Sequence, residues 1–149
     1  MKRFEHFFVV DSNIDQVWKF YTGMNHLKLI TPKRMKLEIL RSTHEFIEED
    51  SEVWLRANLI VNSHWHSKIT FLKPYEYVDE MINGRFKVWK HLHKFKKIDN
   101  DKTEIIDQID FQLPCGILGR LAERYVVYVL SKIFEYREHE TIKILKKQS

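Results

Sequence analysis

The sequence has little of what usually cross-links a chain, divides it into domains or carries it through a membrane. Cys115 is its single cysteine, so no intramolecular disulfide can form. Its four glycines and three prolines are dispersed rather than gathered into a linker. The longest apolar run, residues 125–130, is far shorter than the roughly 20 residues that a membrane-spanning helix needs. We therefore expect a single domain over residues 1–149 and, with no disulfide to require an oxidising compartment, a cytoplasmic location.

Neither sign of charge dominates the chain. Twenty-five lysines and arginines are interspersed with 21 aspartates and glutamates, which leaves a net charge of +4. Such mixing is typical of a solvated surface, so a nucleic-acid partner is not expected. Aromatic residues are plentiful, with ten Phe, six Tyr and four Trp. Side chains of this size fill a core and also line pockets for small molecules.

The first third of the chain predicts one strand and two short helices. Residues 4–10, rich in Phe and Val, are typical of a strand. Ser12 is expected to cap a helix, with Asp15 as its capping-box partner and Gly23 as its end. A second short helix is expected over residues 25–29, before a Thr-Pro pair that disfavours helical backbone.

From residue 35 to residue 113 the apolar residues recur with a period of two, which indicates strands. Residues 53–61 alternate in this way, and Asn62-Ser63 is expected to form the tight turn that follows. Asn83-Gly84 is a strong hairpin signal ahead of a long strand over residues 86–98. Consecutive strands joined by hairpins predict an antiparallel meander.

The chain is expected to end in one long helix over residues 117–146. Six of its residues form an apolar stripe suited to a concave sheet: Leu118, Ala122, Tyr125, Val129, Ile133 and Tyr136. Val127, Leu130 and Phe134 form a second apolar group, to be covered by the short helices or by another subunit. We therefore predict an α+β helix-grip fold, a sheet of about six to seven strands curved around this helix, in a monomer or a homodimer.

One stretch resembles a known superfamily. A YVDE strand at residues 77–80 and Gly-Arg-Phe at residues 84–86 lead into alternating aromatic and histidine residues, Trp89, His91, His93 and Phe95. This string is similar to a pattern of the START-like, SRPBCC helix-grip superfamily, in its polyketide cyclase/dehydrase and lipid-transport branch. Arg85 departs from the small residue or proline that the family often has there.

The resemblance implies a pocket between the sheet and the long helix, where members hold lipids, quinones, polyketides or plant hormones. It implies no catalytic set, because the residues that contact ligands vary within the superfamily. The pocket residues predicted for this chain are Leu55, Leu59, Trp65, Ile69, Phe71, Trp89, His91, His93, Phe95, Asp107, Ile109, Phe111, Tyr125 and Val129.

Two His-x-His pairs invite a metal interpretation, since residues i and i+2 of a strand share one face. The alternation places His91 and His93 on the inner face and His64 and His66 on the outer face, so the four cannot act together. No acidic ligand follows shortly after either pair. We expect no metal and no other cofactor.

The inner histidines have a predicted companion in Asp107. Hairpin geometry places His93 opposite Asp107 and His91 opposite Ile109. A buried carboxylate without a partner is costly, so a histidine across the ladder is expected to pair with it. Two interpretations stay open: a polar pair that locks the sheet, or a ligand anchor or acid–base pair.

Three functions remain compatible with the residues. The first is a binding or carrier domain for an apolar or aromatic small molecule. The second is a cyclase or dehydratase that uses His91, His93 and Asp107 for proton transfer. The third is a module that interacts with proteins or ribosomes, which would require basic residues clustered with exposed aromatics. Nothing in the sequence shows that the protein is an enzyme.

Overall fold

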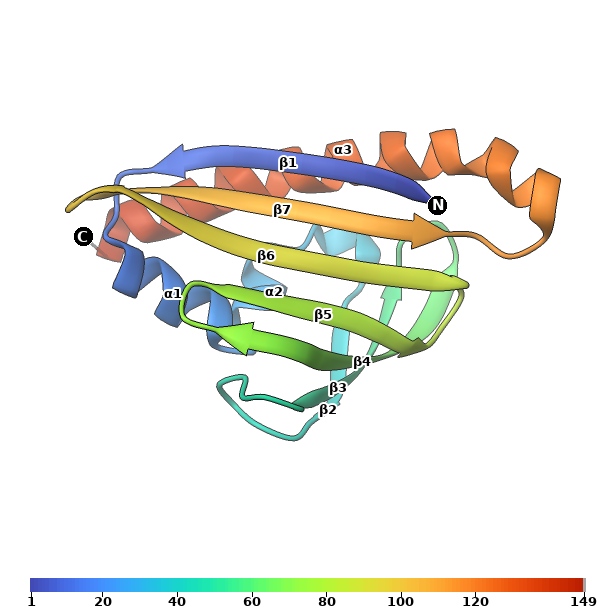
Figure 1. Cartoon of the computed structure of the whole chain (residues 1–149), viewed down its shortest axis with the longest axis horizontal. Coiled ribbons are helices and arrows are strands. Elements are labelled where there is room, and N and C mark those ends of the chain that lie inside the picture. Colours follow the sequence, from blue (N-terminus) through green and yellow to red (C-terminus); the bar gives the residue numbers. More distant parts are fainter. Residues whose placement is uncertain (149) are drawn as a thin grey trace.

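The computed structural model describes residues 1–148. Seven antiparallel strands form one sheet that curves around a long C-terminal helix in this part of the chain (Figure 1). The elements in chain order are β1 (Lys2–Val10), α1 (Ile14–Thr22), α2 (His26–Leu29), the 3-10 helix η1 (Lys33–Met35), β2 (Glu38–Ser42), β3 (Glu52–Asn58), β4 (Asn62–Lys73), β5 (Glu76–Asn83), β6 (Val88–Asp99), β7 (Lys102–Gln112) and α3 (Gly116–Gln148). The predicted helix-grip fold is confirmed.

Strands β2 to β7 form a meander, and the first strand is added at one edge. Its order is β1-β7-β6-β5-β4-β3-β2, so the N-terminal strand pairs with the last one. In β7 every second residue from Thr103 to Phe111 is buried, and this alternation fixes the register because a slip of one residue would turn all of them outward. His93 lies opposite Asp107 and His91 opposite Ile109, which confirms the predicted register.

The start of α1 differs from the prediction by one residue. Asn13, not Ser12, is the N-cap, and its side chain accepts a hydrogen bond of 2.8 Å from the Gln16 backbone N–H. Ser12 is buried and donates its hydroxyl to the Gln16 side chain instead. Asn and Ser cap helices about equally well, so the sequence did not decide between neighbours. The predicted end of the helix at Gly23 is confirmed.

Two local features of the sheet also differ. Strand β3 ends at Asn58, which pairs with Asn62, so residues 59–61 form the turn and Asn62-Ser63 already belongs to β4. A register shift between Ile69 and Phe71 then interrupts the alternation of β4. Because such a bulge turns the side chains that follow it, Ile69 is buried whereas Phe71 is exposed.

The helix α3 is buried along its later turns and exposed along its first ones. Val129 and Ile133 face the sheet as predicted, but Leu118, Ala122 and Tyr125 do not, and 73% of Leu118 is exposed. Figure 1 shows that the first turns of α3, in orange, extend past the ends of the neighbouring strands, whereas Val126, beside Tyr125, is already fully buried in the core. Across residues 1–148, no helix combines the length and the apolar character that crossing a membrane would require.

The core has two apolar parts with a polar layer between them. Along β6, Trp89 belongs to one apolar cluster and Phe95 to the other, with His91 and His93 between them. Along β7, Ile109 and Ile105 belong to these same two clusters and flank Asp107. The strand order therefore places all three polar residues in the middle of the interior, where each is buried.

Candidate functional site

Two adjoining hollows lie between the sheet, the short helices and α3. Their volumes are about 130 Å³ and about 70 Å³, and we refer to them together as the interior cavity. Apolar side chains make up most of the wall of the larger hollow, whereas histidines and tyrosines are prominent around the smaller one. The residues common to both are Leu27, Leu55, Ser67, Asp79, His91 and Arg137. Polar groups therefore gather where the two hollows meet.

Eight of the predicted pocket residues line this cavity: Leu55, Leu59, Trp65, Ile69, Trp89, His91, His93 and Ile109. Phe95, Asp107, Phe111 and Val129 are buried but pack behind the wall. Phe71 and Tyr125 were expected to face inward, and this is wrong: they are 40% and 56% exposed. The bulge in β4 accounts for Phe71. Tyr125 lies on the outer side of α3, because the neighbouring Val126 is the residue that packs into the core. Ligand contact by any of these residues remains a prediction.

The prediction missed seven polar residues of the wall: Tyr21, His26, Thr31, Ser67, Tyr77, Asp79 and Arg137. Two of them had a signal in the sequence. Asp79 lies in the strand that carries the superfamily resemblance, and Arg137 follows Ile133 by one helical turn, at an apolar position of α3. A charged residue at a position of the buried apolar stripe indicates a functional residue.

His91 and Asp107 form the strongest polar contact of the interior. The His91 Nε2 lies 2.7 Å from the Asp107 Oδ1, and both side chains are almost fully buried. Burial acts to raise the pKa of Asp107, but contacts with His91 and His93 outweigh it and hold that pKa below its ordinary value. Asp107 is therefore an ionised carboxylate with a hydrogen-bonded partner.

His93 was predicted to be that partner, and the structure corrects this. Its Nδ1 lies 3.3 Å from the Asp107 Oδ1 but is not directed at it, so this nitrogen has no hydrogen bond within residues 1–148. The ring is instead stacked between His91 and Tyr77, at centroid distances of 3.7 Å and 4.3 Å. Burial, followed by the proximity of His91, lowers the pKa of His93 to about 3, so the ring is neutral at physiological pH.

Asp79 faces the same interior from β5, opposite His91. The Asp79 residue is only partly buried, yet its Oδ1 is fully enclosed and has no hydrogen-bond partner among the described residues. Burial raises the pKa of Asp79, against the opposing influence of His91, Ser67 and Arg137.

Arg137 and His26 bring two more unpaired nitrogens to the wall. Arg137 is 8% exposed, its guanidinium lies 4.9 Å above the ring of Phe134, and its Nη2 has no partner in the described part of the chain. The His26 Nδ1 bonds to the Gly23 carbonyl, whereas its Nε2 has no partner there. Burial lowers the pKa of His26 to about 4, so its ring is also neutral.

The buried side-chain atoms that lack a hydrogen bond share one location. Within residues 1–148 they are His26 Nε2, Trp65 Nε1, Asp79 Oδ1, His93 Nδ1 and Arg137 Nη2. Every one belongs to a residue that lines the interior cavity. Leaving such a group unpaired costs about 1–3 kcal/mol unless a bound molecule or an ordered water satisfies it.

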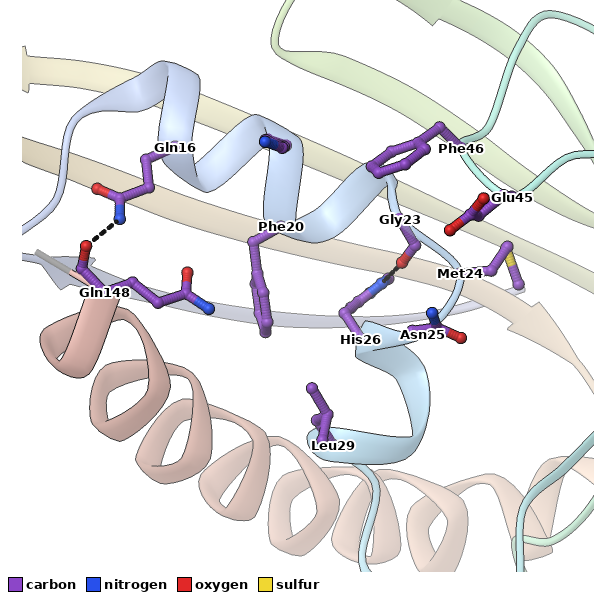
Figure 2. A pocket seen from close by; sticks show the side chains of 11 residues that line it. Gln16, Phe20, Gly23, Met24, Asn25, His26, Leu29, Glu45, Phe46 and Gln148 are labelled. Carbon is purple, nitrogen blue, oxygen red and sulfur yellow. Dashed lines mark hydrogen bonds between the residues drawn. The ribbon is translucent and has the colours of Figure 1, made fainter.

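A wider groove of about 430 Å³ opens on the surface between α1, α2 and the end of α3. Figure 2 shows its wall, with Phe20 of α1 facing Leu29 of α2 and the hydrogen bond from Gln16 to the carbonyl of Gln148. His26 lines both this groove and the interior cavity, so α2 separates the two. The groove's charged residues, Lys19 and Glu45, are exposed and solvated, so we place the candidate site in the interior cavity.

The two histidine pairs point in opposite directions, as predicted. His64 is exposed, and His66 lies on the outer face, 2.8 Å from Glu52 and stacked on Trp54. On the inner side, nitrogen and oxygen atoms of His91, His93 and Asp107 lie within 4.8 Å of one another, the one group in residues 1–148 with the spacing of a metal site.

The sequence placed Asp107 beside the two histidines as a polar or acid–base partner. It did not count Asp107 as a metal ligand, because Asp107 comes close through strand pairing and not through proximity in the chain. These three side chains already contact one another. The rings of His91 and His93 are stacked, with their centroids 3.7 Å apart and their planes inclined by 28°. The Asp107 Oδ1 is also already bonded to His91. The absence of a metal stays a prediction.

Comparison with known proteins supports the fold. No protein-family model and no curated protein sequence matches the chain. Solved structures do match: a START superfamily protein from Mycobacterium smegmatis has a TM-score of 0.76 at 9% identity, over 99% of both chains. The Zhui aromatase/cyclase from Streptomyces sp. R1128 has a TM-score of 0.69 at 15% identity, over 99% of this chain and 92% of the other. Norcoclaurine synthase from Thalictrum flavum, solved with dopamine and hydroxybenzaldehyde, has a TM-score of 0.73 at 12% identity, over 99% and 88%.

Identities this low establish a shared architecture and leave the chemistry open. The strand order, the long C-terminal helix and the likeness over almost the whole length agree with one another. The chain therefore has the START-like helix-grip fold.

Proposed function

We propose that this protein binds a largely apolar small molecule with one polar end in its interior cavity. The observation that carries the proposal is the shared location of the unpaired buried polar atoms, all on the wall of one cavity. Apolar residues such as Trp89, Ile109 and Leu130 supply the remaining wall. Sites for small molecules generally combine an apolar wall with a few polar groups that orient the ligand.

The size of the cavity limits the ligand. Its two hollows together stay below the roughly 300 Å³ at which ligand pockets usually begin. An apolar cavity of about 150 Å³ is known to hold benzene, so the volume of the interior cavity suits a molecule built on a single ring. A lipid chain would require α2, a helix of four residues between cavity and groove, to move outward.

The first test is native mass spectrometry of the purified protein, in which we expect a co-purifying small molecule. Binding can then be followed by the fluorescence of the wall residues Trp65 and Trp89. Leu55→Trp fills the junction of the two hollows and should abolish binding, whereas Leu118→Trp, on the exposed part of α3, should not. Unchanged binding by a folded Leu55→Trp protein would contradict the proposal.

A second candidate function is catalysis of a cyclisation or dehydration. It is favoured by the contact between His91 and Asp107, since a buried carboxylate that orients a histidine is a common arrangement for proton transfer. Conversion of the co-purifying compound by the native protein and not by His91→Gln would support it. Binding without conversion by either protein would support the carrier function and not catalysis.

The interaction module has weaker support. Arg120, Arg124, Tyr125 and Tyr128 are exposed together on α3, which is the combination that this function was expected to require. A specific interface buries about 800 Å² on each partner, supplied by roughly 20–30 residues. Four residues on neighbouring turns are too few, so we do not adopt this function.

A further inference from the structure

Arg137 differs from every other basic residue that the structure describes. It is the one buried lysine or arginine of residues 1–148. Two arginines outside the core have carboxylate partners, with a 2.7 Å contact from Arg3 to Asp110 and a 2.6 Å contact from Arg56 to Glu38. Arg137 has no such contact within 4.0 Å in the described residues.

Neither of the two carboxyl groups of the interior forms an ion pair with Arg137. Asp107 is hydrogen bonded to His91, and Asp79 has no hydrogen bond at its buried Oδ1 and no ion pair with Arg137. The contact that the guanidinium does make is with the face of Phe134. A cation removed from water without a paired anion is among the most costly groups in a protein interior.

The guanidinium of Arg137 lies at the wall of the interior cavity. Its side chain lines both hollows at their junction, and its Nη2 is buried and unpaired. A guanidinium presents its N–H groups as a planar fork that matches a carboxylate with two parallel hydrogen bonds. Trp65, on the wall of the larger hollow, has an unpaired indole N–H that is a second donor.

We infer that the polar end of the ligand is an oxyanion, most simply a carboxylate, and that Arg137 binds it at the junction of the two hollows. This inference rests on the proposed function, since it names the chemical class of the molecule that the cavity takes. The apolar part of such a ligand would lie against Trp89, Ile109 and Leu130 in the larger hollow. The ligand class is therefore an aryl or short alkyl carboxylic acid.

The experiment compares two probes of nearly the same shape, 4-ethylbenzoate and the neutral 4-ethylbenzamide, by isothermal titration calorimetry. Native protein should bind the carboxylate at least 10-fold more tightly than the amide. Arg137→Met keeps an apolar side chain of similar length, and it should lose this preference, chiefly by binding the carboxylate more weakly. Arg137→Lys should retain part of the preference, because it keeps the charge but not the fork.

The matched control is Arg124→Met, an exposed arginine on the same helix, which should leave both affinities unchanged. Equal affinity of native protein for the two probes would overturn the inference, as would an undiminished preference in a folded Arg137→Met protein. If Arg137→Met does not fold, the carboxylate-to-amide affinity ratios of the native and Arg137→Lys proteins still test the inference.

The failures of the two proposals are distinguishable. If the amide binds and the carboxylate binds no more tightly, the cavity takes an apolar ligand and only the oxyanion inference fails. If neither probe binds and native mass spectrometry finds no small molecule in the purified protein, the proposed function fails with it.

Discussion

Asp107 and Asp79 lie on the two strands that flank β6, and both direct a carboxyl group toward the interior beside His91. Asp107 is bonded to His91 at 2.7 Å and its pKa is lowered. Asp79 leaves its Oδ1 unpaired and its pKa is raised. Only Asp79 lines the cavity, whereas Asp107 lies behind the wall.

The same residue type thus has two different surroundings on the two sides of β6. His91 and Asp107 form what we call the closed region, since they are hydrogen bonded to each other within the sheet. The region of Asp79 and Arg137 keeps free polar atoms that face the cavity. We interpret the first region as important for stability and the second as important for binding, and four predictions test this division.

The largest effect is expected where the closed region is broken. His91→Ala leaves the Asp107 carboxylate buried without its hydrogen-bonded partner, so the free energy of unfolding should fall by about 3 kcal/mol. His91→Ala combined with Asp107→Ala should recover part of this loss, because no unpaired charge remains. Urea unfolding of the native, single and double variants measures both quantities. A double variant less stable than His91→Ala would show that the two side chains do not act as partners.

Acid should destabilise the protein through its buried neutral histidines. The pKa values of His26 and His93 are lowered to about 4 and about 3, whereas an unfolded chain has histidine pKa values of about 6.5. Between these values the unfolded state binds protons that the folded state does not. Stability is therefore fully present above pH 6.5 and falls as the pH decreases toward 4, by about 1.4 kcal/mol per pH unit for each histidine.

The His26 contribution can be isolated by substitution. His26→Gln should make the pH dependence shallower, and His139→Gln, at a histidine that is 77% exposed in its side chain, should leave it unchanged. Asp79 has the opposite sign, because a raised pKa favours the protonated folded state, so the difference between variants is the better measurement. Identical pH profiles for the native and His26→Gln proteins would contradict a buried neutral ring.

Replacing Arg137 should leave stability intact or raise it. Arg137→Met removes a buried cation that has no ion-pair partner within residues 1–148 and retains an apolar side chain of similar length. We expect a gain of about 1 kcal/mol or no change, in contrast to the loss from His91→Ala. Thermal unfolding without ligand measures it, and a loss of about 3 kcal/mol would place Arg137 in the closed region instead.

The smallest effect is expected at Asp79. Burial raises the pKa of Asp79 and so favours its neutral form, which an amide matches in shape and charge. Asp79→Asn should therefore change stability by about 0.5 kcal/mol or less. Asp107→Asn, at an ionised and hydrogen-bonded carboxylate, is the matched comparison and should be far more destabilising. Equal losses from the two substitutions would remove the distinction between the regions.

The fold and part of the site followed from the sequence because strand alternation and hairpin positions are local properties. The alternation in residues 103–111 and the turn at residues 99–101 were sufficient to place His93 opposite Asp107. They did not reveal which histidine makes the hydrogen bond, because a diagonal neighbour in a twisted sheet can come closer than the residue directly opposite. They also missed the bulge that turns Phe71 outward.

The sequence by itself determined the order of the elements, the inward faces of β6 and β7, and the separation of His91 and His93 from His64 and His66. Periodicity carries this information because it requires no knowledge of distant residues. Only the tertiary structure decided that the first turns of α3 lie beyond the sheet, that Asp79 and Arg137 meet His91 around one cavity, and that Arg137 has no carboxylate partner. These features depend on how a strand near residue 79 and a helix near residue 137 pack against each other, and such packing over long sequence separations leaves no periodic pattern in the chain.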